Sequence, residues 1–266
     1  MRKTIVLGGS RGIGNAISNR LSQIEDNEVF SYSSDLDTGN IEHINALVED
    51  HKHVDILVLN TGGPPAIDFF DIDEGTWQKY HNQLFLGFCN LLQKIHIKNG
   101  GYVFLVSSFN IKEPNPKLVL SNAYRLAFVS VFKSLSKILA HRKISFINIA
   151  PGPIHTDRLE SLVEDIDELA KELPMNYLPD PDEIGRFVMS IVDKEIKYLS
   201  GVTINFDGAA SNYILWGINM KKLDDIVVIV QARLSSKRIK NKMTRPFAGS
   251  TLVDICLEKI KKSKVI

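Results

Sequence analysis

The chain has 266 residues, 44% of them hydrophobic, which is enough to bury a full α/β core and leaves room for one extension at most. Its 32 Lys and Arg against 31 Asp and Glu argue against a general nucleic-acid binder, whose affinity depends on many phosphate contacts. The 2 cysteines imply no disulfide framework, and no apolar run approaches the roughly 20 residues that span a bilayer. Only Met1, Arg2 and Lys3 precede the first expected strand, and this segment is too short for a signal peptide, so we expect a cytoplasmic protein.

The first elements in the chain predict a nucleotide site. The apolar run from Thr4 to Leu7 is typical of a buried parallel strand, and helical spacing of apolar residues follows from Ile13. Between them lie Gly8, Gly12 and Gly14, which expose backbone N–H groups and let a pyrophosphate approach the positive end of the new helix. The alternative is a glycine-rich turn without a ligand.

Further strands are expected at 28–33, 55–60, 102–107, 144–149 and 202–206, and helices over 41–48, 77–95, 120–140, 157–173 and from 181 onward. This alternation predicts an α/β fold, a Rossmann-like doubly wound parallel sheet of about six strands with a short C-terminal βα extension. The aromatic residues of 77–95 are expected in the core or at a subunit interface. His51 and His53 are interpreted as surface residues, and no metal site is expected.

Three motifs resemble the short-chain dehydrogenase/reductase family: GGSRGIG at 8–14, NTGG at 60–63 and PGPI at 151–154, with a Thr after the last. The resemblance implies an NAD(P) cofactor. The family usually has seven strands and this chain has about six, so one strand and one helix are expected to be missing beside the adenosine half of the cofactor. It also implies a set of cofactor-binding residues: Gly8, Ser10, Arg11, Gly12, Ile13, Gly14, Ser33, Asp35, Leu36, Asn60, Gly62, Arg125, Pro151, Gly152, Ile154 and Thr156. Arg11 and the small Ser33 and Ser34 favour NADP, while Asp35 leaves NAD open.

The same resemblance implies an altered catalytic centre. Family members use a Ser to polarise the carbonyl, a Tyr to give the proton, a Lys to lower the Tyr pKa, and an Asn on the preceding helix. Ser108 fits the Ser position, and the usual spacing then puts Ser121 at the Tyr position, Arg125 at the Lys position and Leu84 at the Asn position. Ser108, Ser121 and Arg125 are therefore the catalytic candidates.

A competing register takes Tyr124 as the acid and puts Phe128 at the Lys position. In the favoured register Ser121 and Arg125 share one helix face. Arg125 is suited to donate to cofactor ribose hydroxyls, or to a carboxylate or phosphate on the substrate, but it is a poor proton relay. The SNxxR pattern resembles a divergent branch of the family, of the flagellin-modification or nonulosonate-pathway type. Residues 157–173 are expected to form an amphipathic helix at the place where the family has its mobile substrate lid.

The dehydrogenase resemblance ends near residue 217, so we expect one domain over 1–217 and a linker over 218–224. Residues 225–266 contain the string IVVIVQARLSSKR, which resembles the opening of cytidylyltransferases that activate sialic-acid-like sugars. The rest of such a domain is absent, so this is interpreted as a truncated module.

These observations predict an NAD(P)-dependent oxidoreductase with an atypical active site, acting on a sugar or sugar-nucleotide carbonyl in surface-glycan or flagellin-glycan biosynthesis. Two alternatives stay open: a catalytically inactive NAD(P)-binding subunit, and a 3-oxoacyl-thioester reductase. We expect a homodimer or homotetramer with a small-molecule substrate and with no nucleic-acid or membrane partner.

Overall fold

The computed structural model describes residues 1–212 and, beyond them, 246–247, 249–251, 254–255 and 257–258. The chain divides into two compact units, Met1–Asn212 and Tyr213–Ile266. In the second unit, β7 (Pro246–Phe247) pairs antiparallel with β8 (Ser250–Thr251). The expected domain end at 217, the linker over 218–224 and most of the truncated module expected over 225–266 lie outside the described residues.

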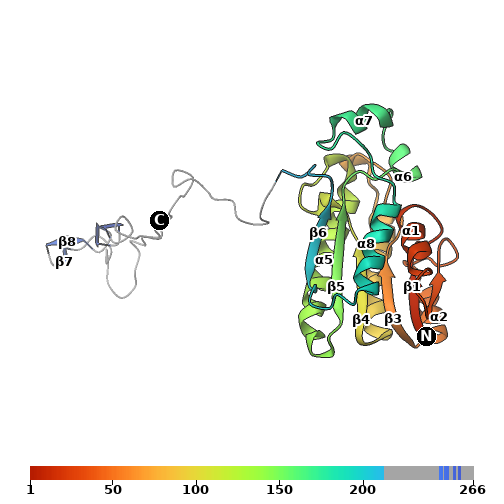
Figure 1. The fold of residues 1–266 in the computed structure, drawn as a ribbon. Helices are drawn as coiled ribbons and strands as arrows, with labels where there is room; N and C mark the ends of the chain where they lie inside the picture. Colours follow the sequence, from red (N-terminus) through yellow and green to blue (C-terminus); the bar gives the residue numbers. More distant parts are fainter. Residues whose placement is uncertain (213–245, 248, 252–253, 256, 259–266) are drawn as a thin grey trace. The chain divides into compact units, whose positions relative to one another are not determined.

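The first unit contains a six-stranded parallel sheet in the order β2-β1-β3-β4-β5-β6, which confirms the predicted fold and strand number (Figure 1). Its strands are β1 (Arg2–Val6), β2 (Asn27–Ser31), β3 (His53–Leu59), β4 (His96–Val106), β5 (Ser145–Pro151) and β6 (Val202–Phe206). The chain leaves β1 toward β2 and then returns to pair β3 on the other side of β1. Ligands of such sheets bind at this switch point, at the carboxyl ends of the strands.

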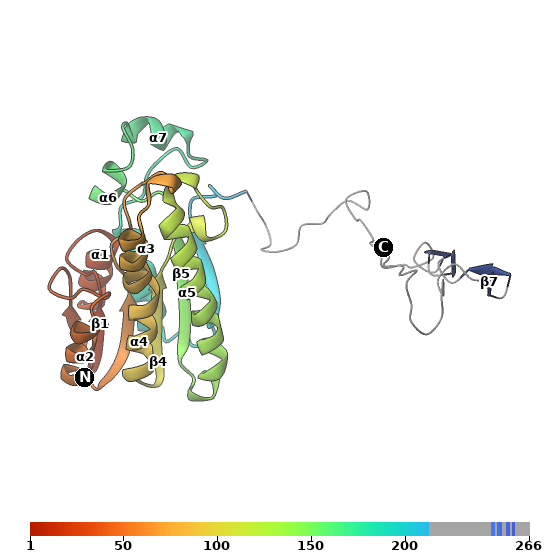
Figure 2. The same ribbon diagram turned by 180° about the vertical axis from the view of Figure 1, so that it is seen from behind.

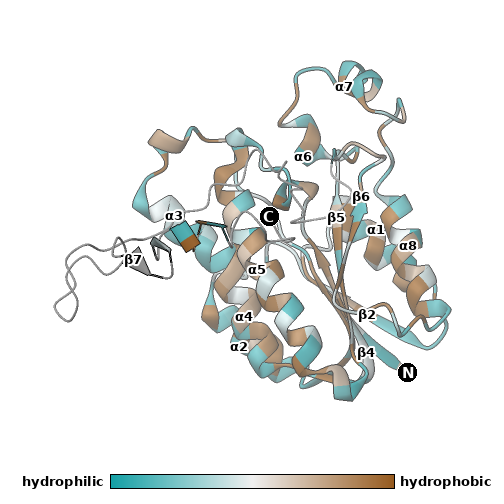
Figure 3. Cartoon of the chain, turned by 90° about the vertical axis from the view of Figure 1, so that its left-hand side faces the viewer, coloured by the Kyte–Doolittle hydropathy of each residue, from teal (hydrophilic) through white to brown (hydrophobic). Residues whose placement is uncertain are grey.

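Helices cover both faces of the sheet (Figures 1 and 2). On one face, α1 (Gly12–Leu21) and α8 (Asp182–Asp193) bury Ile17, Leu21, Ile184 and Val188 against the strands. On the other, α2 (Ile41–Asp50), α4 (Gly87–Lys94) and α5 (Val119–Ile138) bury a second cluster that includes Ile44, Phe88, Phe128 and Phe132. Figure 3 shows the strands as mainly hydrophobic and the helices as two-sided. Among the described helices, none is both long and apolar enough to cross a bilayer.

The helix predicted over 77–95 is present and runs from Glu74 to Lys94, but the prediction missed a π-helical turn inside it. The structure has α3 (Glu74–His81), the π-helical turn (Asn82–Leu86) and then α4 without an interruption. A tertiary contact lies at this turn, where the Thr38 hydroxyl donates a hydrogen bond to the Gln83 carbonyl (2.9 Å). The same strand-to-helix loop approaches Gly87 so closely that a Cβ there would lie 1.8 Å from the Thr38 carbonyl oxygen.

The segment 157–173 was predicted as a single helix, and this prediction is wrong. It forms α6 (Asp157–Glu160) and α7 (Ile166–Glu172), above the carboxyl ends of the strands in Figure 1. Each has its own N-cap, since the Thr156 hydroxyl accepts from the Leu159 N–H and the Asp165 carboxylate from the Glu168 N–H. Two caps within one amphipathic stretch start two helices. Short 3-10 turns complete the unit at Phe69–Asp71, Phe109–Ile111, Pro116–Leu118 and Ala140–Arg142.

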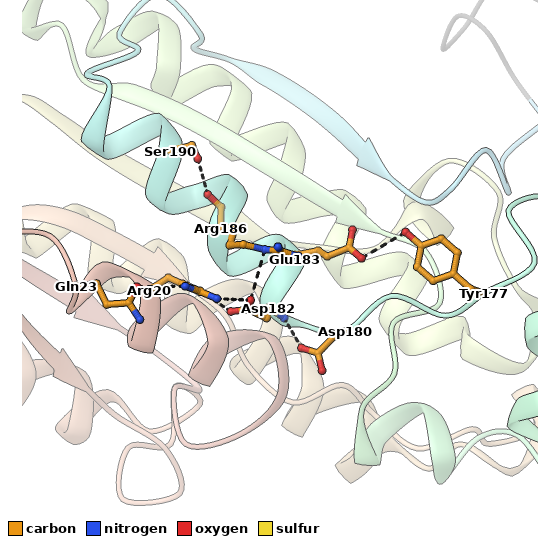
Figure 4. Close-up of polar contacts among 8 residues, drawn as sticks. All are labelled: Arg20, Gln23, Tyr177, Asp180, Asp182, Glu183, Arg186 and Ser190. Carbon is orange, nitrogen blue, oxygen red and sulfur yellow. Dashed lines mark hydrogen bonds and ion pairs between the residues drawn. The ribbon is translucent and has the colours of Figure 1, made fainter.

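Close packing of α8 on α1 fixes the helix that follows the glycine turn. Arg20 of α1 makes a bidentate ion pair with Asp182, each nitrogen 2.6 Å from a carboxylate oxygen (Figure 4). A Cβ at Gly185 would lie 2.6 Å from the Ala16 carbonyl oxygen, so the two backbones are in contact. In the same figure, the Tyr177 hydroxyl donates to Glu183, which ties the segment after α7 to α8.

The interpretation of His51 as a surface residue is wrong. Its side chain is 5% exposed, its Nε2 lies 2.5 Å from the Tyr32 hydroxyl, and its ring packs on Phe30. β2 is the last strand on this side of the sheet, and these three side chains meet beside it. His53 is exposed, as expected, at the start of β3.

Candidate functional site

The glycine turn between β1 and α1 is built by close backbone contacts. Gly8 and Gly12 have φ of 62° and 53°, a region that suits glycine. A Cβ at Gly14 would lie 2.0 Å from the Gly8 carbonyl oxygen and 2.6 Å from the Asn60 amide nitrogen. Asn60 follows β3 and donates from that nitrogen to the Gly8 carbonyl (3.0 Å), so it holds the turn from the neighbouring strand. The turn therefore lies at the switch point of the sheet.

The start of α1 is free to receive an anion. Arg11 occupies the N-cap position without a side-chain hydrogen bond to the helix, and the first turn carries no acidic residue. The N–H groups at the start of a helix need partners from outside it, and the helix dipole favours negative charge there. Gly62 adds open space, since a Cβ there would meet nothing within 4 Å. These residues fit the pyrophosphate of a dinucleotide.

At the predicted binding site for the adenosine half of the cofactor, the Asp35 side chain points toward Ser33. Its carboxylate accepts hydrogen bonds from the Ser33 N–H (2.7 Å) and hydroxyl (3.2 Å). The backbone hydrogen bond from Ser33 is the main cause that lowers the pKa of Asp35, so its charge persists at neutral pH. Leu36 is buried beside it, whereas Ser10 and Arg11 are exposed.

The PGPI loop meets the glycine turn from the opposite side. Pro151 ends β5, and the Gly152 N–H donates to the Phe206 carbonyl (3.0 Å). Ile154 is buried with the α1–α8 cluster, where Ile13 also packs. The Thr156 methyl lies 3.4 Å from the position of a Cβ on Gly12. The structure thus brings together Gly12 and Thr156, which are far apart in sequence.

Arg125 lies at the corner of the sheet where β3 and β4 end. From α5 its guanidinium donates to the Val106 carbonyl (2.9 Å), the Thr61 carbonyl (3.3 Å) and the Ser121 hydroxyl oxygen (3.2 Å). Burial and the nearby Arg158 lower the pKa of Arg125 to about 10, so the group stays charged at neutral pH. Arg125 therefore combines a structural role with a charge.

The two candidate serines retain donor hydrogens. Because the Ser121 oxygen accepts from Arg125, its hydroxyl hydrogen is free to donate. The Ser108 oxygen accepts from the Asn110 N–H (3.2 Å), with the same consequence. Ser108 follows β4, two residues after the carbonyl that Arg125 binds. Among the hydrogen bonds of the described residues, none joins Ser108 to Ser121.

The geometry disfavours the competing register. The Tyr124 hydroxyl donates to the Trp77 carbonyl (3.1 Å), and the ring packs edge-on against the Trp77 ring. Burial raises the pKa of Tyr124, so the group is a weaker acid than a free tyrosine. At the Asn position, Leu84 is 1% exposed inside the π-helical turn and offers no polar group.

Sequence reasoning missed two polar residues of this corner. Arg158 of α6 donates to the Pro64 carbonyl in the NTGGPP loop. Gln83 of the π-helical turn donates to the Thr61 hydroxyl (3.1 Å). Arg158 closes the string PGPIHTDR, so its place after the PGPI motif was the available signal. For Gln83 we see no comparable signal in the sequence.

A pocket of about 340 Å³ lies beyond the PGPI loop. Pro153, Phe206 and Asp207 line it at the ends of β5 and β6, and Leu173, Met175 and Tyr177 line it from the segment around α7. It does not include Ser108, Ser121 or Arg125. Within the described residues, no group of three or more His, Cys, Asp or Glu is arranged to hold a metal.

A doubly wound parallel sheet with a glycine turn at its switch point defines a dinucleotide-binding α/β protein. The family model described as enoyl-(acyl carrier protein) reductase matches residues 37–210, and the chain belongs to the short-chain dehydrogenase/reductase family of oxidoreductases, which act on a carbonyl or alcohol. A second model, described as cytidylyltransferase, matches residues 227–266.

Curated relatives are distant but cover the domain. A 3-oxoacyl-[acyl-carrier-protein] reductase of Aggregatibacter actinomycetemcomitans is 27% identical over 78% of this chain and 99% of its own length. An acetoacetyl-CoA reductase of Shinella zoogloeoides is 24% identical over 78% and 97%. Among solved structures, a short-chain dehydrogenase family protein of Francisella tularensis has a TM-score of 0.71 at 21% identity, covering 78% of this chain and 98% of that one. One from Burkholderia cenocepacia, in complex with NADP, has a TM-score of 0.70 at 21% identity over 78% and 96%.

Proposed function

We propose that this chain is an NADP(H)-preferring oxidoreductase in which a serine–arginine pair replaces the family's Tyr and Lys, and that it acts on a sugar or sugar-nucleotide carbonyl. The observation that carries the proposal is the Arg125–Ser121 hydrogen bond. In this arrangement the Arg125 cation donates to the Ser121 hydroxyl oxygen, which leaves the hydroxyl hydrogen free to donate to a substrate oxygen. The family's Lys and Tyr have the same relation to the substrate oxygen.

Each residue of the corner has a distinct task in this proposal. The bound cofactor supplies or accepts the hydride. Ser108 and Ser121 donate hydrogen bonds to the substrate oxygen and stabilise the charge that develops on it. Arg125 orients the Ser121 hydroxyl and adds positive charge without releasing a proton. The proton comes from water or from the substrate, since neither serine is an adequate acid.

The cofactor preference follows from exposed charge at the adenosine end. Arg11 is exposed beside the glycine turn and suits the 2′-phosphate of NADP. Asp35 is a fixed negative charge nearby, and it keeps NAD as the alternative cofactor. Related solved structures hold NADP or NADPH.

The sugar substrate is supported by association. The cytidylyltransferase match at 227–266 suggests a surface-glycan or flagellin-glycan setting, because such enzymes activate sugars. A cytoplasmic homodimer or homotetramer remains our expectation.

Two other functions have specific support. A cofactor-binding subunit without catalysis is favoured by the loss of the usual Tyr, Lys and Asn. A 3-oxoacyl-thioester reductase is favoured by the names of the curated relatives.

Turnover assays on the full chain separate these possibilities. NADPH and NADH oxidation would be followed with a 4-keto nucleotide sugar and with acetoacetyl-CoA. We expect turnover of the sugar with NADPH, and a Ser108→Ala variant with kcat lower by about 100-fold, the usual effect of losing one such donor. Its NADPH affinity should match that of the wild type. Ser130→Ala, on the exposed face of α5, is the control. A wild type inert toward both carbonyls would support the binding subunit instead.

A further inference from the structure

Two arginine side chains lie close to Gly63, the second glycine of the NTGGPP loop at 60–65. A Cβ at Gly63 would lie 3.6 Å from the Nη2 of Arg158 and 3.8 Å from the Nη2 of Arg125. One side chain comes from α5 and the other from α6, so two residues more than 30 positions apart in the sequence place their guanidinium groups beside the same glycine. The absence of a side chain at Gly63 leaves the space between them open.

Both arginines have hydrogen-bond donors to spare. A guanidinium carries five N–H groups. Arg125 donates to the Ser121 hydroxyl and to two backbone carbonyls, and Arg158 donates to the Pro64 carbonyl. All of these acceptors are neutral. Across the part of the chain that the structure describes, no carboxylate forms an ion pair with either arginine.

The two positive charges oppose one another. Burial is the main cause that lowers the pKa of both groups, and the charge of Arg158 lowers that of Arg125 further. Like charges in a partly desolvated corner cost free energy unless an anion lies between them. Arg158 is exposed and Arg125 is partly buried, so an incoming ligand would reach the pair from the side of Arg158.

We propose that Arg125 and Arg158 together bind a carboxylate or phosphate group of the substrate. The proposal rests on the proposed function, because it names the substrate class of that same corner. The planar fork of each guanidinium matches the two oxygens of such a group. Ser121, bonded to Arg125, would then lie beside the same ligand, so the anion orients a carbonyl toward the serines. The proposed binding site for the cofactor pyrophosphate is the start of α1, so the anion bound by the two arginines would belong to the substrate.

Binding of matched sugars to the full chain tests this proposal without requiring turnover. Calorimetry would compare N-acetylneuraminic acid with its methyl ester, and glucose 1-phosphate with glucose, in the presence of NADPH. We expect an anionic sugar to bind at least about tenfold more tightly than its neutral partner, the effect of one charge-assisted hydrogen bond or more. The two pairs distinguish a carboxylate ligand from a phosphate ligand.

Variants at Arg158 assign the effect to the pair. Arg158→Ala should remove the preference for the anionic sugar and leave NADPH affinity unchanged, and Arg158→Lys should keep part of the preference. Arg186→Ala, which removes an arginine 57% exposed on α8, is the matched control. Thermal melting verifies that each variant folds. Equal binding of charged and neutral sugars by the wild type, or a parallel loss of NADPH binding in Arg158→Ala, would overturn the proposal. Absence of turnover would count against the proposed function alone.

Discussion

The proposed cofactor side, at the glycine turn, and the proposed catalytic corner, around Ser121 and Arg125, are built in different ways. On the cofactor side, Gly8 and Gly14 matter because they lack a side chain, and Asn60 holds their backbone. In the catalytic corner, Ser121 and Arg125 matter for the atoms that their side chains carry. A site defined by backbone space tolerates few substitutions at its glycines. A site defined by side chains can change its chemistry through substitutions that leave the backbone in place.

The comparison is tested most strongly by restoring the family's side chains. If only the acid and its partner have changed, Ser121→Tyr with Arg125→Lys should raise NADPH-dependent reduction of a simple ketone by about 100-fold or more, the usual contribution of a positioned general acid. Steady-state kinetics on the purified variant would measure it.

Arg125→Lys alone is the control, because it keeps a cation and adds no acid. A doubly substituted protein that folds and binds NADPH but shows no gain would contradict the expectation. Leu84 at the Asn position would then be the next difference to examine.

A single methyl group added at Gly14 should weaken cofactor binding at the glycine turn. A Cβ at Gly14 would lie 2.0 Å from the Gly8 carbonyl oxygen, so Gly14→Ala forces the turn apart. Overpacking of this kind costs about 1–3 kcal/mol. If that cost falls on the bound state, NADPH affinity drops by roughly 10- to 100-fold. Calorimetry on the folded variant would measure the loss.

Gly75→Ala in α3 offers a matched control away from the site, since a Cβ there comes no closer than 3.4 Å to its nearest neighbour, the Asp73 carboxylate. It should bind NADPH as the wild type does. Equal affinities for Gly14→Ala and Gly75→Ala would mean that the glycine turn does not position the cofactor.

The sequence predicted the sheet well because buried parallel strands are apolar runs that periodicity detects. All six strands were found, and their ends lie within two residues of those in the structure, except that β4 begins six residues before the predicted start. Irregularities within the predicted helices were missed. At the π-helical turn, the Gln83 carbonyl accepts a hydrogen bond from Thr38, which lies 45 residues away in the sequence. Apolar spacing does not report such a contact. The second lid helix was readable in principle, because Asp165 is a good N-cap residue.

The candidate site was predicted only as positions, and whether those residues act remains a prediction. Spacing identified Ser121 and Arg125, and the structure shows them hydrogen-bonded. The spacing did not reveal that Arg125 also donates to the carbonyls of Val106 and Thr61, or that Arg158 lies beside Arg125. Those contacts arise from the packing of α5 and α6 on strand ends, which no local pattern encodes.

A third region, the edge of the sheet at β2, is built by packed side chains rather than by glycines. Beside β2, the buried His51 contacts the Tyr32 hydroxyl. Burial is the main cause that lowers the pKa of His51, Lys3 lowers it further, and Asp50 and Glu28 oppose the shift. A histidine whose pKa is lower in the folded state binds its proton more readily when unfolded, where its pKa is about 6.5. Its contribution to stability is therefore complete above that pH and is lost as the pH falls through the lower folded pKa.

We expect this to be the smallest of the effects, and it is measured as a difference between melting temperatures at pH 7.5 and pH 5.5. His51→Gln keeps a hydrogen-bonding side chain next to Tyr32 and removes the titration, so it should lose less of its melting temperature on acidification than the wild type. His141→Gln, at an exposed position after α5, should behave as the wild type does. If His51→Gln and His141→Gln lose equal amounts, the edge beside β2 does not respond to pH. Stability in acid would then depend on charges elsewhere in the domain.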